Sequence, residues 1–276
     1  MPRGNRRQSR AEPMPGDEGD AGGRDSQYVA ALGRGLTLLG CFRSGDEHGL
    51  GNRELARRSG LAQPTVSRLA YTLMQAGYLS YDRRTARYQL GPSILTLSYV
   101  MLGNMNVGRI ARPFMRRFVT ETDVTVAMNV HSRFRMVVIE GIGGNSPVAL
   151  RLDVGTRIPV ATTAAGRAYL AGLTDEEREP LMAELERLTP PADWPRICDG
   201  IARAAEEIEK LGFCLAIGEW RAAVSAAAVP LAPVGAPPMS LSCGGSVQEL
   251  PRERVLAEIG PQLVAIRHEI EQAIAR

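Results

Sequence analysis

The sequence lacks any apolar run long enough to cross a membrane, because Gly, Ser, Arg or Asp interrupts every candidate stretch. Its first residues are basic, but no apolar stretch follows them, so a cleaved secretion signal is not expected. The four cysteines (Cys41, Cys198, Cys214 and Cys243) lie far apart and form no CxxC pair, which indicates neither a zinc site nor a disulfide framework. We therefore expect a cytoplasmic protein with free thiols, no metal, no cofactor and no membrane partner.

Catalytic motifs are also missing. The sequence contains no GxSxG, no HExxH and no phosphate-loop motif. His131 and His268 have no Cys, Asp and Ser at a spacing that would support catalysis. The acids Asp175, Glu176 and Glu177 are typical of a helix start, where the helix dipole favours negative charge. We assign no catalytic residue and do not predict an enzyme.

Charge is unevenly distributed along a chain that is long enough, at 276 residues, for two domains. Lys210 is the only lysine, so arginine carries nearly all the positive charge. Between residues 27 and 90, nine arginines face four acids, whereas acids outnumber basic residues after residue 90. A phosphate backbone requires such a basic region, although an excess of this size is also common in arginine-rich proteins.

Residues 52–90 carry the pattern of two short helices followed by a basic hairpin. Asn52 is suited to cap a first helix over Arg53–Ser59, and Gly60 is suited to end it. Pro64 is tolerated in the first turn of a second helix, whose apolar residues recur on one face. Two short strands around residues 82–85 then predict a hairpin with an arginine-rich tip. This order favours a winged helix-turn-helix over an ordinary helical hairpin with a charged face.

The second helix would be the recognition helix, because its outer face carries short polar groups, an arginine and a tyrosine. The hairpin would hold flanking phosphates or enter the minor groove. The predicted contacts with double-stranded DNA are Gln63, Pro64, Thr65, Ser67, Arg68, Tyr71, Arg83, Arg84 and Arg87.

The flanking segments complete the predicted organisation. Residues 1–26, which are rich in Gly, Pro, Arg and Asp, form a predicted disordered tail. Residues 27–90 form the DNA-binding domain, in which an apolar helix over Tyr28–Phe42 packs behind the helix pair through Val29, Leu32, Leu36, Leu39 and Phe42. Residues 91–106 form a linker helix whose apolar stripe suits either a core or a second chain. Residues 107–276 form the second domain.

The second domain mixes strands and helices without strict alternation, which predicts an α+β fold with helices on the faces of a sheet. Helices are expected over 107–122, 163–170, 175–188, 197–211 and 252–275. Strands are expected over 124–130, 136–140, 149–153, 213–217, 223–230 and 239–243.

One helix start in this domain has the composition of an anion site. Small residues follow Thr163 and leave the amide groups of the first turn uncovered, which suits the carboxylate of a small metabolite. Close packing of a helix on a sheet selects the same small residues, so both interpretations stay open. The candidate effector-binding residues are Thr163, Ala164, Ala165, Gly166, Glu219 and Ser242.

The segments YVAALGRGLTLL, RELARRSGLAQPTVSRLAYTLMQAGYL, RYQLGPSILTLSY and VGTRIPVATTAAGRAYLAGL occur in this order along the chain. Through these segments the sequence resembles the IclR family of bacterial transcription regulators over nearly its whole length after Gln27. It looks most like the branch of that family that controls aromatic catabolism. The resemblance implies a winged helix-turn-helix, a linker helix and a C-terminal GAF-like α/β effector-binding domain, assembled as a homodimer or homotetramer on a palindromic operator. Backbone amides at Ala164 and Ala165 would hold a small organic or aromatic acid.

The sequence departs from that family pattern at four positions. Ala216 and Ile217 stand where an Asp is frequent, Ala226 where Cys or Ser is frequent, and Gly244 where a second Ser is frequent. We expect a less polar pocket and a larger or more apolar ligand, such as an aromatic acid. The leading hypothesis is a ligand-responsive transcription factor. The alternative is a small-molecule sensor or enzyme whose N-terminal domain contacts other proteins.

Overall fold

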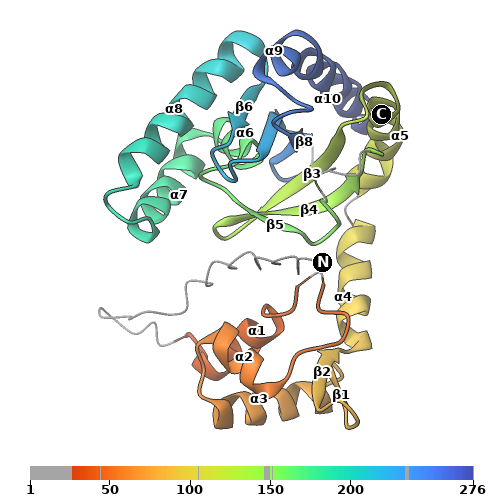
Figure 1. Cartoon of the computed structure of the whole chain (residues 1–276), viewed down its shortest axis with the longest axis vertical. Coiled ribbons are helices and arrows are strands. Elements are labelled where there is room, and N and C mark those ends of the chain that lie inside the picture. The colour runs from red at the N-terminus through yellow and green to blue at the C-terminus, as the bar shows by residue number, and fades with distance from the viewer. Residues whose placement is uncertain are drawn as a thin grey trace, which may run out of the picture. The chain divides into compact units, whose positions relative to one another are not determined.

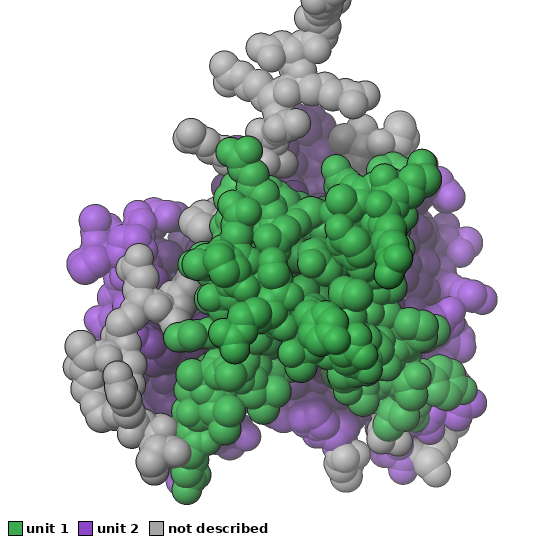
Figure 2. Space-filling model, turned by 90° about the horizontal axis from the view of Figure 1, so that it is seen from below, with its two compact units in different colours: residues 1–103 green, residues 104–276 purple. Residues whose placement is uncertain are grey.

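The computed structural model describes residues 27–43, 45–104, 106–145, 150, 152–233 and 236–275. The chain divides into two compact units, residues 1–103 and 104–276, which are coloured separately in Figure 2. The tail predicted to be disordered, residues 1–26, lies outside the described residues.

The first unit is a winged helix-turn-helix followed by a further helix (Figure 1). Its elements are α1 (Ala30–Leu39), α2 (Asn52–Ser59), α3 (Gln63–Gln75), β1 (Leu79–Asp82), β2 (Arg87–Leu90) and α4 (Pro92–Asn104). Strands β1 and β2 are antiparallel, and Leu50 forms an additional bridge to Tyr88. The predicted architecture of this part is confirmed.

The turn between α2 and α3 depends on Gly60, whose φ of 71° lies in the left-handed region that glycine adopts without steric cost. The predicted cap at Asn52 is wrong. Asn52 is the first helical residue, Gly51 precedes it as the N-cap, and the Asn52 amide instead donates to the carbonyl oxygen of Gln63 at 3.3 Å. Asn52 therefore ties the two helices together.

Helix α1 buries a different face from the one expected. Leu38 and Cys41 enter the small core with Leu55, Val66, Ala70 and other apolar residues. The predicted packing of this helix behind the helix pair is confirmed, and Leu39 and Phe42 lie against the same core. The prediction is wrong for Val29 and Leu32, each 62% exposed, and for Leu36, 58% exposed. An apolar stripe on α1 is thus left at the surface of the chain.

The second unit contains a six-stranded antiparallel sheet in the order β5-β4-β3-β8-β7-β6. Its helices are α5 (Asn106–Thr122), α6 (Ala164–Ala171), α7 (Asp175–Leu188), α8 (Trp194–Leu211), α9 (Arg252–Arg254), the π-helical turn Val255–Ile259 and α10 (Gly260–Ile274). Its strands are β3 (Thr125–Ser132), β4 (Arg135–Ile142), β5 (Arg157–Pro159), β6 (Cys214–Ile217), β7 (Val224–Leu231) and β8 (Met239–Ser246).

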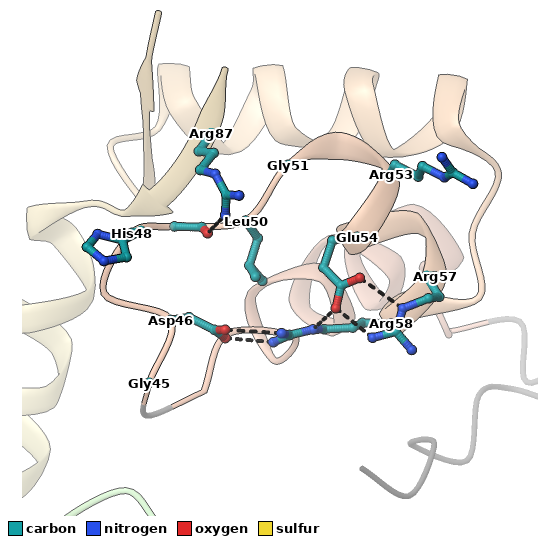
Figure 3. Close-up of a pocket in the computed structure, with 11 residues that line it drawn as sticks. Gly45, Asp46, His48, Leu50, Gly51, Arg53, Glu54, Arg57, Arg58 and Arg87 are labelled. Atoms are coloured by element: carbon teal, nitrogen blue, oxygen red, sulfur yellow. Dashed lines mark hydrogen bonds and ion pairs between the residues drawn. The ribbon is translucent and has the colours of Figure 1, made fainter. Parts of the chain in front are cut away.

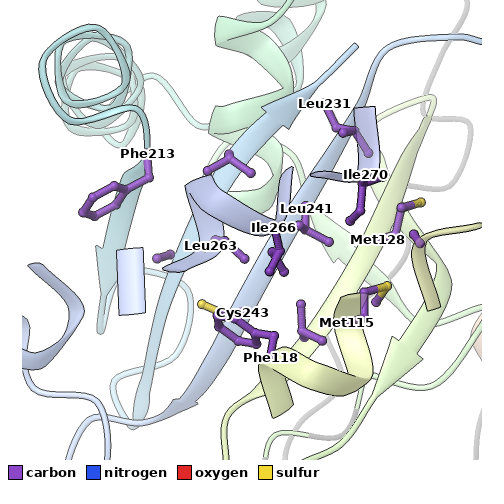
Figure 4. Close-up of a cluster of buried hydrophobic side chains, with 14 of the residues drawn as sticks. Met115, Phe118, Met128, Phe213, Leu231, Leu241, Cys243, Leu263, Ile266 and Ile270 are labelled. Carbon is purple, nitrogen blue, oxygen red and sulfur yellow. The ribbon is translucent and has the colours of Figure 1, made fainter. Parts of the chain in front are cut away.

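Helices cover both faces of this sheet (Figure 1). Helices α5 and α10 bury one face in a core that includes Met115, Phe118, Leu241, Leu263 and Ile266 (Figure 4). Helix α6 lies on the other face, and α8 packs on α6 and β6. Successive residues of a strand point to opposite faces, so each strand contributes to both layers.

Two expectations for this unit need correction. The strand expected over 149–153 is not formed at Leu150, Leu152 or Asp153, and the edge strand is β5, which pairs with β4. Ala149 and Arg151 lie outside the described residues. The long C-terminal helix contains a π-helical turn at Val255–Ile259. The caps predicted at Thr163 and Thr174 are confirmed.

Candidate DNA-binding surface and effector site

The outer face of α3 is exposed as predicted. Val66 and Ala70 are fully buried, which fixes the rotation of the helix about its axis. Gln63, Ser67 and Arg68 consequently point to solvent, and Tyr71 is 62% exposed. Of the other predicted contacts on α3, Pro64 is exposed in the first turn and Thr65 is half-buried.

Arg68 carries an unneutralised charge on this face. Within the described part of the chain, no carboxylate pairs with its guanidinium group. The neighbouring Ser67 hydroxyl donates to the carbonyl oxygen of Gln63 at 3.1 Å, so it is already engaged within the helix. Arg68 and Tyr71 are therefore the side chains best placed to reach outward.

The hairpin presents two more arginines at its tip. Asp82 organises the turn, because its carboxylate accepts hydrogen bonds from the Thr85 hydroxyl at 2.7 Å and from the Arg84 amide at 2.9 Å. These bonds hold the pKa of Asp82 below its usual value. Arg83 and Arg84 are exposed on the turn, whereas Arg87 donates to the carbonyl oxygen of Gly49 at 2.8 Å.

A surface pocket of about 730 Å³ lies between α2 and the loop before it (Figure 3). Arg58 binds Asp46 at 2.6 Å and Glu54 at 2.7 Å, and Arg57 also binds Glu54. Hydrogen bonds from Arg57 and then Arg58 lower the pKa of Glu54 from 4.5 to about 2. Part of the arginine excess of this unit is thus neutralised internally. Arg53 also lines the pocket.

The start of α6 offers buried amide groups. The Thr163 hydroxyl caps the helix by accepting from the Gly166 amide at 3.2 Å and donates to the carbonyl oxygen of Pro159 at 2.6 Å. Ala164 and Ala165 are 0% and 2% exposed. Among the described contacts, their amides have no acceptor. Buried amides of a first helical turn form a favourable site for an anion.

Gly166 has a packing role in the same turn. A Cβ atom at this position would lie 2.0 Å from the carbonyl oxygen of Val160 and 2.4 Å from its Cα atom. Glycine is therefore required for the close approach of α6 to the preceding segment. Close packing thus explains Gly166, whereas the anion-site interpretation of Ala164 and Ala165 stays a prediction.

Glu219 is the counter-ion of a buried arginine. Arg167 is 2% exposed and donates from Nη2 to Glu219 at 2.6 Å, while Arg203 donates to the other carboxylate oxygen at 2.9 Å. Burial works to raise the pKa of Glu219, but the hydrogen bonds from the two arginines outweigh it and keep the pKa low. Gly200 leaves the space for the Arg167 guanidinium, since a Cβ atom there would lie 2.3 Å from Nη2.

Ser242 lies on the face of the sheet that α6 covers. Its hydroxyl accepts from the Asn129 amide at 2.9 Å and is within 3.4 Å of the carbonyl oxygen of Ala127, to which it donates. Two positions farther along β8, Gly244 pairs with Ala226, and Ala226 pairs with Ala216. Three of the four positions that depart from the family pattern thus form one row of small residues across three strands, whereas Ile217 packs against the core on the opposite face.

No group of three metal-ligating side chains occurs in the described ranges. Among the described helices, none is long and apolar enough to cross a membrane.

Comparison with known proteins identifies two family models. The IclR helix-turn-helix domain matches residues 31–83, and the bacterial transcriptional regulator IclR C-terminal domain matches residues 99–272. The HTH-type transcriptional regulator TsaQ1/TsaQ2 of Comamonas testosteroni is 30% identical over 246 residues, which cover 88% of this chain and 87% of that protein.

Solved structures share the fold. An IclR family transcriptional regulator from Brucella abortus is 38% identical, with a TM-score of 0.76, and the match covers 91% of this chain and 94% of that one. An IclR homolog from Microbacterium hydrocarbonoxydans, complexed with 4-hydroxybenzoate, is 20% identical with a TM-score of 0.68, over 89% of this chain and 99% of that one.

Proposed function

The chain belongs to the IclR family of bacterial transcriptional regulators, and from this membership we propose that it binds a palindromic operator as a dimer and responds to an aromatic acid. It is a ligand-responsive DNA-binding regulator and not an enzyme. The observation that best supports the DNA contact is the exposure of Arg68 on the outer face of α3, where no described carboxylate pairs with it.

We assign sequence readout to α3 and phosphate contacts to the hairpin. An arginine without a carboxylate partner retains its donors for a guanine edge, where a bidentate contact contributes roughly 1–3 kcal/mol of discrimination. Arg83 and Arg84 lie at an exposed turn, where short contacts with phosphates require no rearrangement of the hairpin. Gln63 and Tyr71 lie on the same exposed face as Arg68 and complete the proposed base-reading surface.

The effector is proposed to be an aromatic acid whose carboxylate accepts from the amides of Ala164 and Ala165. These amides are buried and lack acceptors among the described residues. The row Ala216, Ala226 and Gly244 provides apolar surface in place of the polar groups that a short keto acid would need. The 4-hydroxybenzoate complex of a structural neighbour supports this ligand class.

Dimerisation is proposed to use the apolar stripes that the first unit leaves uncovered. On α4, Leu95 is 73% and Tyr99 is 78% exposed, and on α1 Leu32 is 62% exposed. Exposed apolar stripes of this kind mark interfaces with other chains. A two-fold dimer also matches the symmetry of a palindromic site and doubles the contacts of one recognition helix.

The DNA assignment is tested by comparing Arg68→Ala with Arg187→Ala, which removes an exposed arginine from α7. We expect Arg68→Ala to lose about 1–3 kcal/mol of operator affinity while effector binding is retained, and Arg187→Ala to change neither. Equal operator affinity for both variants would remove Arg68 from the recognition surface. Calorimetry with 4-hydroxybenzoate and pyruvate tests the effector, and equal or tighter binding of pyruvate would contradict the proposed ligand class.

A further inference from the structure

Three polar side chains beneath α6 have buried atoms that find no hydrogen-bond partner among the described residues. These atoms are Oδ1 of Asn129, Nε2 of His131 and the hydroxyl oxygen of Ser240. Asn129 and Ser240 are each 0% exposed. Leaving such a group unpaired is unfavourable, so native structures supply a partner for nearly all of them.

The three residues lie together on one face of the sheet. Asn129 and Ser240 are direct cross-strand partners on β3 and β8, and His131 is two residues along β3 from Asn129. The His131 ring stacks on Tyr169 of α6, with ring centroids 4.9 Å apart. Met239 and Leu241, which flank Ser240, belong to the core on the opposite face, so Ser240 also points towards α6.

The orientation of the Asn129 side chain is fixed by its neighbours. Its amide nitrogen donates towards the carbonyl oxygens of Ala127 and Ser240, at 3.2 and 3.3 Å, and to the Ser242 hydroxyl. Exchanging the amide oxygen and nitrogen would place the oxygen against two carbonyl oxygens. The unpaired atom is therefore an acceptor that no flip of the amide can satisfy.

The hydrogen-bonding capacity of the three unpaired atoms determines which ligand group can pair with them. Burial lowers the pKa of His131 and favours the neutral ring, which has one acceptor nitrogen. A hydroxyl group can donate to Oδ1 of Asn129 or to an acceptor nitrogen of His131, and it can accept from the Ser240 hydroxyl. A carboxylate has no proton for either acceptor and would be repelled by them.

The spacing of Ala164 and Tyr169 on α6 sets the distance between the amides at the helix start and the polar cluster of Asn129, His131 and Ser240. Tyr169 follows Ala164 by five residues, which corresponds to about 7.5 Å along a helix and is comparable to the length of a benzene ring substituted at opposite ends. We propose that Asn129, His131 and Ser240 form a second polar end of the effector site, and that this end binds a hydroxyl group of the ligand opposite its carboxylate. This inference rests on the aromatic-acid effector proposed above and adds the residues that select a hydroxylated ring.

The test measures binding of benzoate and 4-hydroxybenzoate to the full chain by calorimetry. The wild-type protein is expected to bind 4-hydroxybenzoate at least about tenfold more tightly, the effect of a buried hydrogen bond. Ser240→Ala should lose most of this ratio. Ser225→Ala is the matched control, because Ser225 also has a buried unpaired hydroxyl but lies on the opposite face with Ala227 and Val229. Ser225→Ala should keep the ratio.

A second variant, His131→Phe, keeps the test decisive if Ser240→Ala does not fold. His131→Phe keeps an aromatic ring to stack on Tyr169 but removes the acceptor nitrogen, so it should also reduce the ratio. Equal binding of the two acids by the wild-type protein, or an unchanged ratio in both Ser240→Ala and His131→Phe, would overturn the hydroxyl site alone. Binding of neither acid would overturn the aromatic-acid effector and this inference with it.

Discussion

Replacing Gly166 by alanine tests the close approach at the start of α6. The new Cβ atom would lie 2.0, 2.4 and 2.5 Å from the oxygen, Cα and carbonyl carbon of Val160. These are backbone atoms, so no side-chain rotation relieves the overlap. Overpacking of this kind destabilises the folded state by about 1–3 kcal/mol. We expect a value near the upper end of this range because the neighbouring atoms belong to the backbone. The better helix propensity of alanine offsets roughly 1 kcal/mol, which leaves a net loss of about 2 kcal/mol.

The loss is measurable by thermal denaturation. For a domain of this size, 1 kcal/mol corresponds to a change in Tm of roughly 2–4 °C, so Gly166→Ala should lower Tm by about 4–8 °C. Gly143→Ala is the control, because a Cβ atom there meets nothing within 4 Å, and its effect should stay within about 0.5 kcal/mol. Displacing the amides of Ala164 and Ala165 should also weaken binding of 4-hydroxybenzoate. Equal Tm values for the two variants would contradict the close approach of Gly166 to the Val160 backbone.

Three further predictions follow from burial and charge. Burial raises the pKa values of Cys214 and Cys243 to about 12, so neither thiol should react with a disulfide reagent at pH 8 unless denaturant is added, and rapid reaction in the native protein would contradict this. The pKa of Glu54 in the folded protein is about 2, below its ordinary value of 4.5. The ionised Glu54 therefore stabilises the folded state above pH 4.5, and this stabilisation is lost as the pH falls towards 2. The difference in unfolding free energy between wild type and Glu54→Gln should shrink over that range. Gly200→Ala should destabilise by about 1–3 kcal/mol because it clashes with the Arg167 guanidinium, and combining it with Arg167→Met should restore part of the loss in denaturant titrations.

The helix-turn-helix could be predicted because its signals are local. The Gly60 turn, Pro64 in a first helical turn and the arginine-rich hairpin each act within a few residues. The α6 cap at Thr163 was predictable for the same reason. Periodicity alone could not assign the buried face of α1, because a stripe that pairs with another chain has the same apolar pattern as one that enters a core.

The candidate effector site could be predicted only in part. The small residues of α6 indicate either amides or close packing, and Gly166 is explained only by its distance to Val160, which no local pattern records. Glu219 was predicted to contact the effector, but its carboxylate pairs with Arg167, which lies 52 positions away in the sequence. Asn129 and Ser240 are brought together by the pairing of β3 with β8, so their shared face follows from the topology of the sheet.

The most direct test of DNA recognition is recovery of sheared genomic DNA by the purified full chain at about 150 mM salt, where non-specific binding to phosphates is weak, followed by sequencing. A regulator that reads bases through α3 should enrich a few palindromic sites, and Arg68→Ala should lose that enrichment while Arg187→Ala keeps it. Uniform recovery of genomic fragments by all three proteins, with and without 4-hydroxybenzoate, would contradict sequence-specific recognition by this surface.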